Sequence, residues 1–344
     1  MNIVVLAGGL STERNVSLTT GAMVQNALVK RGHHALLADV FMGYPLSGSI
    51  EKEFEKATEP SEVTKISELV PDIEKVKKER GGNYGEFFGE NILDLCRYAD
   101  VVFMALHGEN GENGRIQAAF DLLGIRYTGS GYLGCAVSIH KNLSKQIFSS
   151  CGVRTPHGKM VKKGEEASFA EFGCDALVIK PCSGGSSIGV YIAKNEEEFQ
   201  KALSEALLLE EEILIEEYVS GREFSVGIIG STALPAIEII PLQGFYDYKN
   251  KYQADLTKEI CPADITPEEE NLLKSSALKA FNALGLSGYA RLDFILTNNK
   301  EAVCLEANSL PGMTPTSLLP QEAEAAGISY GELCEEIIRL SFEK

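Results

Sequence analysis

Hydrophobic and polar positions in the first part of the chain alternate between two kinds of segment. Residues 2–9 (NIVVLAGG) and 99–106 (ADVVFMAL) are short apolar runs, typical of strands buried on both faces of a parallel sheet. Residues 18–32 lie between them with helical spacing and end in Gly32, the residue type expected just past a helix. The pattern predicts an open α/β domain over residues 1–130.

The polar and charged residues 47–89 interrupt this pattern and are interpreted as a solvated helix and loops inserted in the first domain. A second unit is predicted over residues 131–215. Residues 176–181 (ALVIKP) and 213–219 (ILIEEYV) resemble strands, and residues 194–209 between them resemble a helix. This helix has Asn195 as its predicted cap, with Glu198 three residues later.

A third unit is predicted over residues 216–344. Its expected strands are residues 223–230 (EFSVGIIG), 288–296 (GYARLDFIL) and 301–308 (EAVCLEAN). A capping box that begins at Thr266, with proline next and Glu269 at the third helical position, predicts a helix that ends at Gly285. The fold class is therefore α/β.

Composition narrows the class of protein. The chain has 344 residues and a net charge of -17, which disfavours a protein that coats nucleic acid. Its eight cysteines form no CxxC pair, so we expect reduced thiols and a cytoplasmic location. The first residues are interpreted as a strand rather than a signal peptide. No apolar run approaches the roughly 18 residues that span a bilayer, so no membrane association is expected.

The segment 178–190 (VIKPCSGGSSIGV) resembles a phosphate-binding loop, but its lysine is misplaced for the common types. In a Walker-type loop the lysine follows the glycines, whereas Lys180 precedes them. The dinucleotide motif GxGxxG also fails, because Ser186 occupies its second glycine position. The pattern predicts a lysine at a strand end next to a mobile Gly-Ser loop.

Acidic and amide side chains lie near the ends of two predicted strands. Glu306 and Asn308 are two residues apart and therefore share a face, and a neighbouring strand could add Asp293. Such an oxygen-only set suits Mg²⁺. Either stretch alone could simply be polar residues that close a strand, but together with the Lys180 loop they favour a metal site.

Three other segments could contribute to a site. Glu13 lies in a Gly-Ser-Thr loop directly after the first strand, where open parallel sheets bind ligands, although a surface glutamate is the alternative. His107 opens the glycine-rich segment 107–117, although a lone histidine is as often structural. Residues 245–252 (FYDYKNKY) form an aromatic and basic segment without a clear period, which suggests a loop that closes over a site.

The order of these motifs resembles that of the D-alanine-D-alanine ligases, members of the ATP-grasp superfamily. The resemblance covers nearly the whole chain and runs from GGLSTERNVSL through HGENGENGRIQ, YTGSG, KPCSGGSSIGV, FYDYKNKY and ARLDF to EANSLPGMTPTSLLP. It implies an ATP-grasp fold of three domains, with ATP between the central and C-terminal domains. It also implies ATP-dependent ligation of two D-alanine molecules through an acyl phosphate, for peptidoglycan precursor synthesis in the cytoplasm, by a homodimer.

The resemblance also implies roles for particular residues. The residues that match nucleotide-binding positions are Lys141, Lys180, Ser187, Glu216, Glu217, Val219, Glu223 and Lys251. The matches to ligands of Mg²⁺ or Mn²⁺, two ions in all, are Asp293, Glu306 and Asn308. The matches to catalytic positions are Glu13, Ser186, Tyr252, Arg291, Gly312 and Ser317, and those to further substrate contacts are His107 and Leu318.

Five positions depart from the family pattern without removing a metal ligand or a phosphate lysine. Leu305 and Ala307 flank Glu306 where asparagine and isoleucine are more usual. Arg14 stands where the family commonly has histidine, Asn113 where it has aspartate, and His140 where an aspartate usually precedes Lys141. Two alternatives stay open. The chain could join D-alanine to D-serine or D-lactate, or it could be an ATP-binding regulatory protein without turnover.

Overall fold

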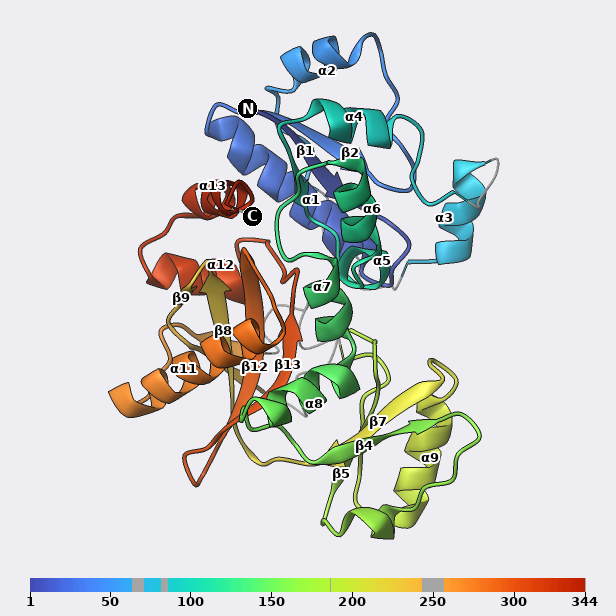
Figure 1. Ribbon diagram of the computed structural model, residues 1–344, viewed down its shortest axis with the longest axis vertical. Helices are drawn as coiled ribbons and strands as arrows, with labels where there is room; N and C mark the ends of the chain where they lie inside the picture. The colour runs from blue at the N-terminus through green and yellow to red at the C-terminus, as the bar shows by residue number, and fades with distance from the viewer. Residues whose placement is uncertain (64–70, 82–85, 186, 243–256, 344) are drawn as a thin grey trace.

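Three β-sheets organise the described part of the chain, as the computed structural model shows (Figure 1). The structure describes residues 1–63, 71–81, 86–185, 187–242 and 257–343. The first sheet lies in the N-terminal part of the chain, the second in the middle, and the third in the C-terminal part. This arrangement brings segments that are distant in sequence to shared edges.

The first sheet consists of three parallel strands in the order β2-β1-β3. Its strands are β1 (Asn2–Ala7), β2 (His34–Asp39) and β3 (Val101–Met104). Strand β1 is central and is fully buried from its second residue, which explains its unbroken apolar run. The predicted parallel sheet of the first domain is confirmed.

Helix α1 (Arg14–Lys30) connects the first two strands. It begins four residues before the predicted Leu18, because the backbone N–H of Ser17 already donates to the carbonyl of Glu13, 2.9 Å away. Beyond its end Gly32 has φ +86°, a left-handed conformation that favours glycine. The predicted end of the helix is confirmed.

Short helices surround the rest of the first sheet. The inserted segment contains α2 (Ile50–Lys56) and α3 (Ile73–Arg80). Helix α3 has no buried residue, as expected for a solvated helix, whereas α2 buries Phe54 against the sheet. The helices that follow are α4 (Ile92–Tyr98), α5 (Glu109–Glu112) and α6 (Arg115–Leu123).

The second sheet consists of four antiparallel strands in the order β4-β7-β5-β6. Its strands are β4 (Gly158–Lys162), β5 (Leu177–Pro181), β6 (Tyr191–Ala193) and β7 (Glu212–Glu217), with a short 3-10 helix, η1 (Phe169–Phe172). Helix α9 (Glu196–Ala206) packs on this sheet through Phe199 and Leu203. The side chain of Asn195 accepts from the backbone N–H of Glu198, so the predicted cap is confirmed.

The third sheet is antiparallel, in the order β11-β10-β8-β12-β13, with β9 paired to β8. Its strands are β8 (Gly221–Ile229), β9 (Thr232–Ala233), β10 (Ile237–Pro241), β11 (Thr257–Ile260), β12 (Tyr289–Thr297) and β13 (Ala302–Asn308). Helix α11 (Pro267–Ala283) covers one face, where Phe224 and Leu292 are buried. Its capping box of Thr266 and Glu269 forms as predicted.

Four further helices connect these units. They are α7 (Tyr132–Ile139), α8 (Lys141–Ser150), α12 (Leu318–Ala325) and α13 (Tyr330–Leu340). Helix α13 returns from the end of the chain to lie beside α1 (Figure 1). Its Leu333 and Ile337 belong to the same hydrophobic core as β1, so the two ends of the chain fold together.

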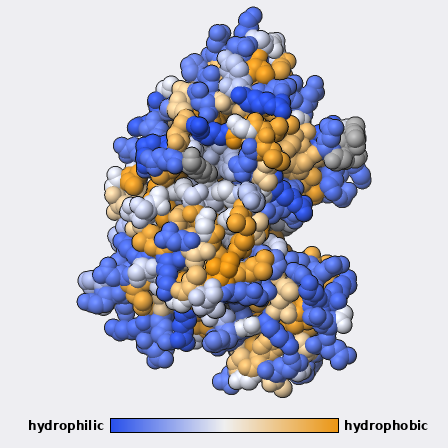
Figure 2. All heavy atoms as spheres, viewed as in Figure 1, coloured by the Kyte–Doolittle hydropathy of each residue, from blue (hydrophilic) through white to orange (hydrophobic). Residues whose placement is uncertain are grey.

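Hydrophilic residues dominate the outer edges of the face in Figure 2. Hydrophobic residues gather there mainly toward the middle of the molecule (Figure 2). The eight cysteines are all free thiols, and five of them are buried. Among the residues that the structure describes, no helix is long and apolar enough to cross a bilayer.

Candidate active site

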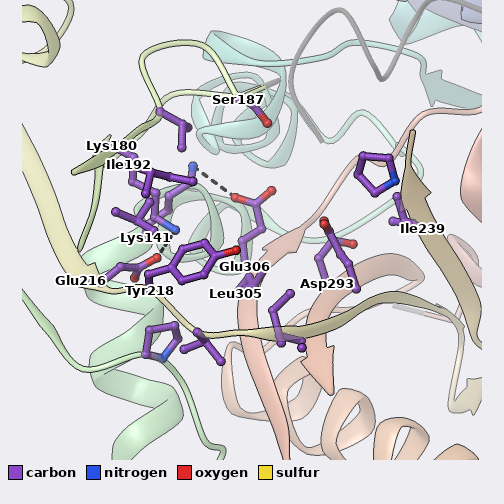
Figure 3. Close-up of a pocket in the computed structure, with 18 of the residues that line it drawn as sticks. Lys141, Lys180, Ser187, Ile192, Glu216, Tyr218, Ile239, Asp293, Leu305 and Glu306 are labelled. Carbon is purple, nitrogen blue, oxygen red and sulfur yellow. Dashed lines mark ion pairs between the residues drawn. The ribbon is translucent and has the colours of Figure 1, made fainter. Parts of the chain in front are cut away.

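A cavity of about 480 Å³ separates the second sheet from the third (Figure 3). The second sheet contributes Lys180 and Glu216, and α8 contributes Lys141. On the opposite wall the third sheet contributes Asp293 and Glu306. Cationic and anionic groups that are far apart in sequence therefore face one cavity.

A buried ion network holds the lysine side of the cavity. Glu216, on β7, pairs with Lys180 of β5 at 2.5 Å and with Lys145 of α8 at 2.9 Å. Burial alone would raise the pKa of Glu216, but the two ammonium groups lower it below the usual carboxyl value. Likewise, burial opposes the charge of Lys180, yet Glu216 and Glu306 raise its pKa. The network therefore keeps Lys180 charged in a buried place.

Lys145 was not among the residues singled out from the sequence. It is buried, its ammonium group also donates to the hydroxyl of Thr155 at 3.0 Å, and burial lowers its pKa. Its position four residues after Lys141, on the same side of α8, is the signal that could have indicated it.

Lys141 connects the Gly-Ser loop with the third sheet. It is the first residue of α8, and its ammonium nitrogen lies 2.5 Å from the carbonyl oxygen of Gly184 and 3.5 Å from Glu306. Its backbone N–H donates to the carbonyl of Cys182, just after Lys180. Ser187 lies on the same loop with φ +58° and lines the cavity, whereas Ser186 lies outside the described residues.

The acidic residues of the third sheet lie side by side, as the alternation of side chains predicts. Asp293 is the register partner of Glu306, and Arg291 is the partner of Asn308. The guanidinium group of Arg291 donates two hydrogen bonds to Asp293, at 2.9 and 2.8 Å, and the amide of Asn308 donates a third at 3.1 Å. All four side chains therefore share one face of the third sheet, and Asp293 and Glu306 on this face line the cavity.

These residues fit the chemistry of a magnesium ion. Two carboxylates and an amide on one face supply the hard oxygen donors that Mg²⁺ prefers, and they leave room for phosphate oxygens. No cluster of three histidine, cysteine, aspartate or glutamate side chains suited to a metal occurs in the part of the chain that the structure describes. The site therefore suits an ion whose remaining ligands are phosphate oxygens of a substrate.

Three further residues that match nucleotide-binding positions line the same cavity. Glu217, Val219 and Glu223 are all on its wall. Glu217 accepts a hydrogen bond from the backbone N–H of His157 at 3.0 Å, and Glu223 lies in register with Ile295 on β12. Tyr218, half exposed between two of these residues, also lines the cavity (Figure 3). The sequence analysis did not single it out.

Two smaller cavities continue from the first toward the first sheet. One, of about 310 Å³, is bordered by Glu13 and by the Gly184 loop. The other, of about 180 Å³, is lined by Glu13, His107, Arg291, Gly312, Ser317 and Leu318. The structure thus brings together every described residue that the resemblance assigns to the amino-acid substrates or to the intermediate.

Glu13 lies between two glycine loops. A side chain at Gly108 or at Gly185 would place its Cβ 3.0 Å from the Oε2 atom of Glu13. Because Gly108 also has φ +64°, that position favours glycine twice over. The carboxylate of Glu13 is therefore positioned by segments from both the first and the second unit.

His107 is buried, and both nitrogens of its ring have partners. Nδ1 lies 3.1 Å from the carbonyl oxygen of Leu310, and Nε2 lies 3.2 Å from the hydroxyl of Thr20. Burial lowers its pKa, so the ring is held neutral. These contacts connect the first sheet with the loop after β13.

Glu112 is a site residue that the sequence analysis missed. It lines both smaller cavities, and its carboxylate accepts from the backbone N–H of Gly108 at 2.6 Å. Burial, and then the charge of Glu13, raise its pKa to about 8. Its position inside the glycine-rich segment 107–117 is the sequence feature that could have indicated Glu112.

The loop after β13 presents Gly312 and Ser317 to the smallest cavity. The hydroxyl of Ser317 accepts from the backbone N–H of Thr314 at 3.2 Å and lies 2.8 Å from that residue's hydroxyl. A Cβ at Gly312 would lie 2.8 Å from the same Ser317 oxygen. The absence of a side chain at Gly312 therefore leaves its backbone open to the cavity.

The remaining positions are placed as follows. Lys251 and Tyr252, like the rest of the proposed closing loop, lie outside the described residues. Arg14 forms a buried ion pair with Asp39 and also donates to the carbonyl of Gly9. His140 is the N-cap of α8 and pairs with Glu212 at 3.0 Å. The side chain of Asn113 accepts from the backbone N–H of Arg115.

Three sheets, with a cavity that sets lysines of the second opposite carboxylates of the third, define a protein of the ATP-grasp fold. Comparison with known families agrees. Residues 2–130 match the family described as D-ala D-ala ligase N-terminus, and residues 157–339 match the one described as D-ala D-ala ligase C-terminus. The chain belongs to the D-alanine-D-alanine ligase family, whose members are ATP-dependent ligases.

Full-length relatives support this assignment. The chain is 43% identical to a D-alanine–D-alanine ligase of Pediococcus pentosaceus, over 98% of this chain and 97% of the relative. It is 42% identical to that of Lacticaseibacillus casei, over 98% and 95%.

Solved structures agree at the level of the fold. A D-alanine–D-alanine ligase from Bacillus anthracis complexed with ATP has a TM-score of 0.76 and 29% identity, covering 100% of this chain and 97% of that one. The VanG D-Ala:D-Ser ligase from Enterococcus faecalis has a TM-score of 0.76 and 28% identity, covering 98% of both chains.

Proposed function

We propose that this protein uses ATP to join two D-alanine molecules into D-alanyl-D-alanine. The observation that carries the proposal is the continuous set of cavities from Lys180 through Glu306 to Ser317. One end has the charges needed for phosphates, and the other has a carboxylate, an arginine and a hydroxyl suited to amino acids. Relatives of known name at 43% identity support the same activity.

The first chemical step activates a carboxylate, which is a poor electrophile. The carboxylate oxygen of the first D-alanine attacks the γ-phosphorus of ATP, the bond to the β-phosphate oxygen breaks, and ADP leaves with an acyl phosphate formed. Lys141 and Lys180 would neutralise charge on the phosphates, and their ammonium groups facing the cavity support this role. Asp293, Glu306 and Asn308 would hold Mg²⁺, which supplies charge neutralisation when it is bound.

The second step forms the amide. The free amine of the second D-alanine attacks the acyl carbon, the tetrahedral intermediate collapses, and phosphate leaves as the amine loses its proton. We assign Glu13 to the amine of the first substrate, and Arg291 with the Gly312 N–H to the developing oxyanion. Ser317 would contact the carboxylate of the second substrate, and Leu318 its methyl group.

Other features belong to the same proposal. Domains over residues 1–130, 131–215 and 216–344, two metal ions, a homodimer and a cytoplasmic location are all expected. Ser186 and Tyr252 would complete a link from Glu13 to the closing loop, with Lys251 near the phosphates. The product would serve peptidoglycan precursor synthesis.

Assays of ADP release with D-alanine, D-serine and D-lactate as second substrates test the proposal. D-Alanine should be preferred over D-serine, because Leu318 offers an apolar surface to the second substrate. D-Serine should still be a slow substrate, since an apolar pocket rejects an added hydroxyl by only roughly 10²-fold. D-Lactate should be poorer still, because its hydroxyl is a weaker nucleophile. Preference for either competitor, or ATP binding without turnover, would contradict the proposal.

A further inference from the structure

A buried acid lies behind the smallest cavity. Glu322 is on α12, one turn after Leu318, and its exposed fraction is 0%. Within the described part of the chain, neither of its carboxyl oxygens has a partner with good hydrogen-bond geometry, although the backbone N–H of Gly227 is close enough to lower its pKa. A buried polar group without partners costs free energy, so its presence requires a physical account.

The carboxyl group of Glu322 packs against a glycine of the third sheet. A Cβ at Gly227 of β8 would lie 2.4 Å from its Oε2 atom and 2.4 Å from a methyl carbon of Leu319. Gly227 is the register partner of Arg291 on β12. The acid therefore fills the space that a β8 side chain would occupy, directly beside Arg291.

The charged and titratable groups around it explain how this acid can be buried. Burial raises the pKa of Glu322 well above the usual carboxyl value. The charge of Arg291 and the backbone N–H of Gly227 act in the opposite direction, whereas Asp293 and Glu270 raise it further. Burial also raises the pKa of the nearby Cys261 thiol to about 12. The uncharged acid packs like a neutral side chain.

Glu322 lies one turn into α12. Ser317 is the N-cap of this helix, and Leu318 and Glu322 are four residues apart on one face. On the other side of the same loop, the hydroxyl of Tyr330 donates to the carbonyl of Met313 at 2.5 Å. Both ends of the segment 313–322 are therefore held, and its middle lines the cavity of about 180 Å³.

We propose that Glu322 is a positioning residue for the second substrate. Its packing against Gly227 holds Ser317 and Leu318 at the depth in the cavity that this substrate requires. The inference rests on the proposed function and deepens it. The acid touches no substrate in this account, and it acts only through the first turn of α12.

The kinetic test compares Glu322→Ala and Glu322→Gln with the parent chain in an ADP-release assay. Fitting the rate against D-alanine concentration separates the KM values of the first and second substrates. Glu322→Ala should raise the second KM about tenfold, the effect of one lost pocket contact, and leave the KM for ATP and the first D-alanine within about twofold. Glu322→Gln keeps the shape of the neutral acid and should largely restore the second KM.

The matched control is Glu324→Ala, which removes an exposed glutamate from the same helix. It should leave all three KM values at the parental level. Equal changes in all three KM values for Glu322→Ala, no change at all, or a loss in Glu322→Gln as large as in the alanine variant would overturn the proposal.

A double-mutant cycle tests the contact between Glu322 and Gly227 without any activity measurement. Gly227→Ala should lower the midpoint of thermal unfolding, because its Cβ collides with the acid, and adding Glu322→Ala should recover part of the loss. Additive effects would show that Glu322 is not seated on Gly227 and would overturn the inference. Failure of the proposed function itself appears separately, as a parent chain that releases no ADP with D-alanine.

Discussion

At the scale of single residues, the site separates groups that carry charge from groups that are held neutral. Glu306 faces the lysines across the cavity of about 480 Å³ and is the register partner of Asp293. Glu112 and His107 are instead uncharged or close to it near neutral pH, because burial shifts the pKa of each toward the neutral form. Substitution of a charged group such as Glu306 should therefore affect mainly catalysis, whereas substitution of a neutral buried group such as Glu112 should affect mainly stability.

Glu306→Gln should abolish ligation and leave the fold intact. The change removes one of two carboxylates from the proposed magnesium site, and weaker charge neutralisation should raise the barrier by several kcal/mol, about 10³-fold or more in rate. Turnover by ADP release and folding by circular dichroism measure the two effects. Near-parental turnover at ordinary Mg²⁺ concentrations would contradict the metal assignment.

Glu112→Gln should change how stability depends on pH. Because the folded-state pKa of Glu112 is about 8, the folded chain keeps a proton that the unfolded chain releases above its ordinary pKa of 4.5. The free energy of unfolding should therefore fall as pH rises between these values, by at most about 1.4 kcal/mol per pH unit from this group.

Urea denaturation at pH 5 and pH 8 measures this contribution. The glutamine variant cannot release that proton, so its stability relative to the parent should improve at the higher pH. Glu109→Gln, in the same short helix, is the control. Parallel pH profiles for the parent chain and Glu112→Gln would show that Glu112 does not have the raised pKa.

At the scale of elements, the largest cavity depends on how α8 docks against β5 and β7. The ion network of Lys145, Glu216 and Lys180 contributes to this docking, since it has one member on each element. Because both lysines lower the pKa of Glu216, the stabilisation is present above the ordinary carboxyl pKa and is lost as pH falls below it.

Glu216→Gln should therefore destabilise the protein by about 3–5 kcal/mol, because it removes the buried carboxylate that the two ammonium groups share. It should also weaken ATP binding, since Lys180 loses its partner. Urea denaturation and calorimetric titration with ATP measure both effects. Lys162→Ala breaks the exposed pair with Glu212 and serves as a control that should change neither quantity. An equally small effect of Glu216→Gln would contradict the network's role.

At the scale of the whole molecule, the C-terminal helix completes the N-terminal core. Ile337 of α13 is 1% exposed and packs in the same cluster as β1, and Arg31 of α1 pairs with Glu335 at 2.5 Å. The first unit therefore cannot form its full core until the end of the chain is present. We expect the first and last segments to unfold together.

Ile337→Ala should lower the free energy of unfolding by about 2–5 kcal/mol, the usual cost of such a cavity in a core. Its effect should appear far away in sequence, as faster amide hydrogen exchange in β1 and α1. Glu336→Gln, one residue earlier and partly exposed, is the control. Unchanged exchange in β1 would show that the two ends of the chain are energetically independent.

The sequence by itself determined the elements and their local chemistry. Strand periodicity and capping residues predicted β1, β12, β13, α9 and α11, because these signals act between residues close in the chain. Alternation within strands also predicted that Glu306 and Asn308 share a face. The resemblance of motifs then indicated the family before any contact was known.

Only the tertiary structure decided which distant groups meet. Lys145 and Lys180 share Glu216, Glu13 fits between Gly108 and Gly185, and Glu322 rests on Gly227. None of these contacts follows from a local period, because each depends on how separate elements dock and on side-chain volumes at the contact. Burial, which shifts the pKa values of Glu112 and Glu322, is likewise a property of the packed molecule rather than of a sequence pattern.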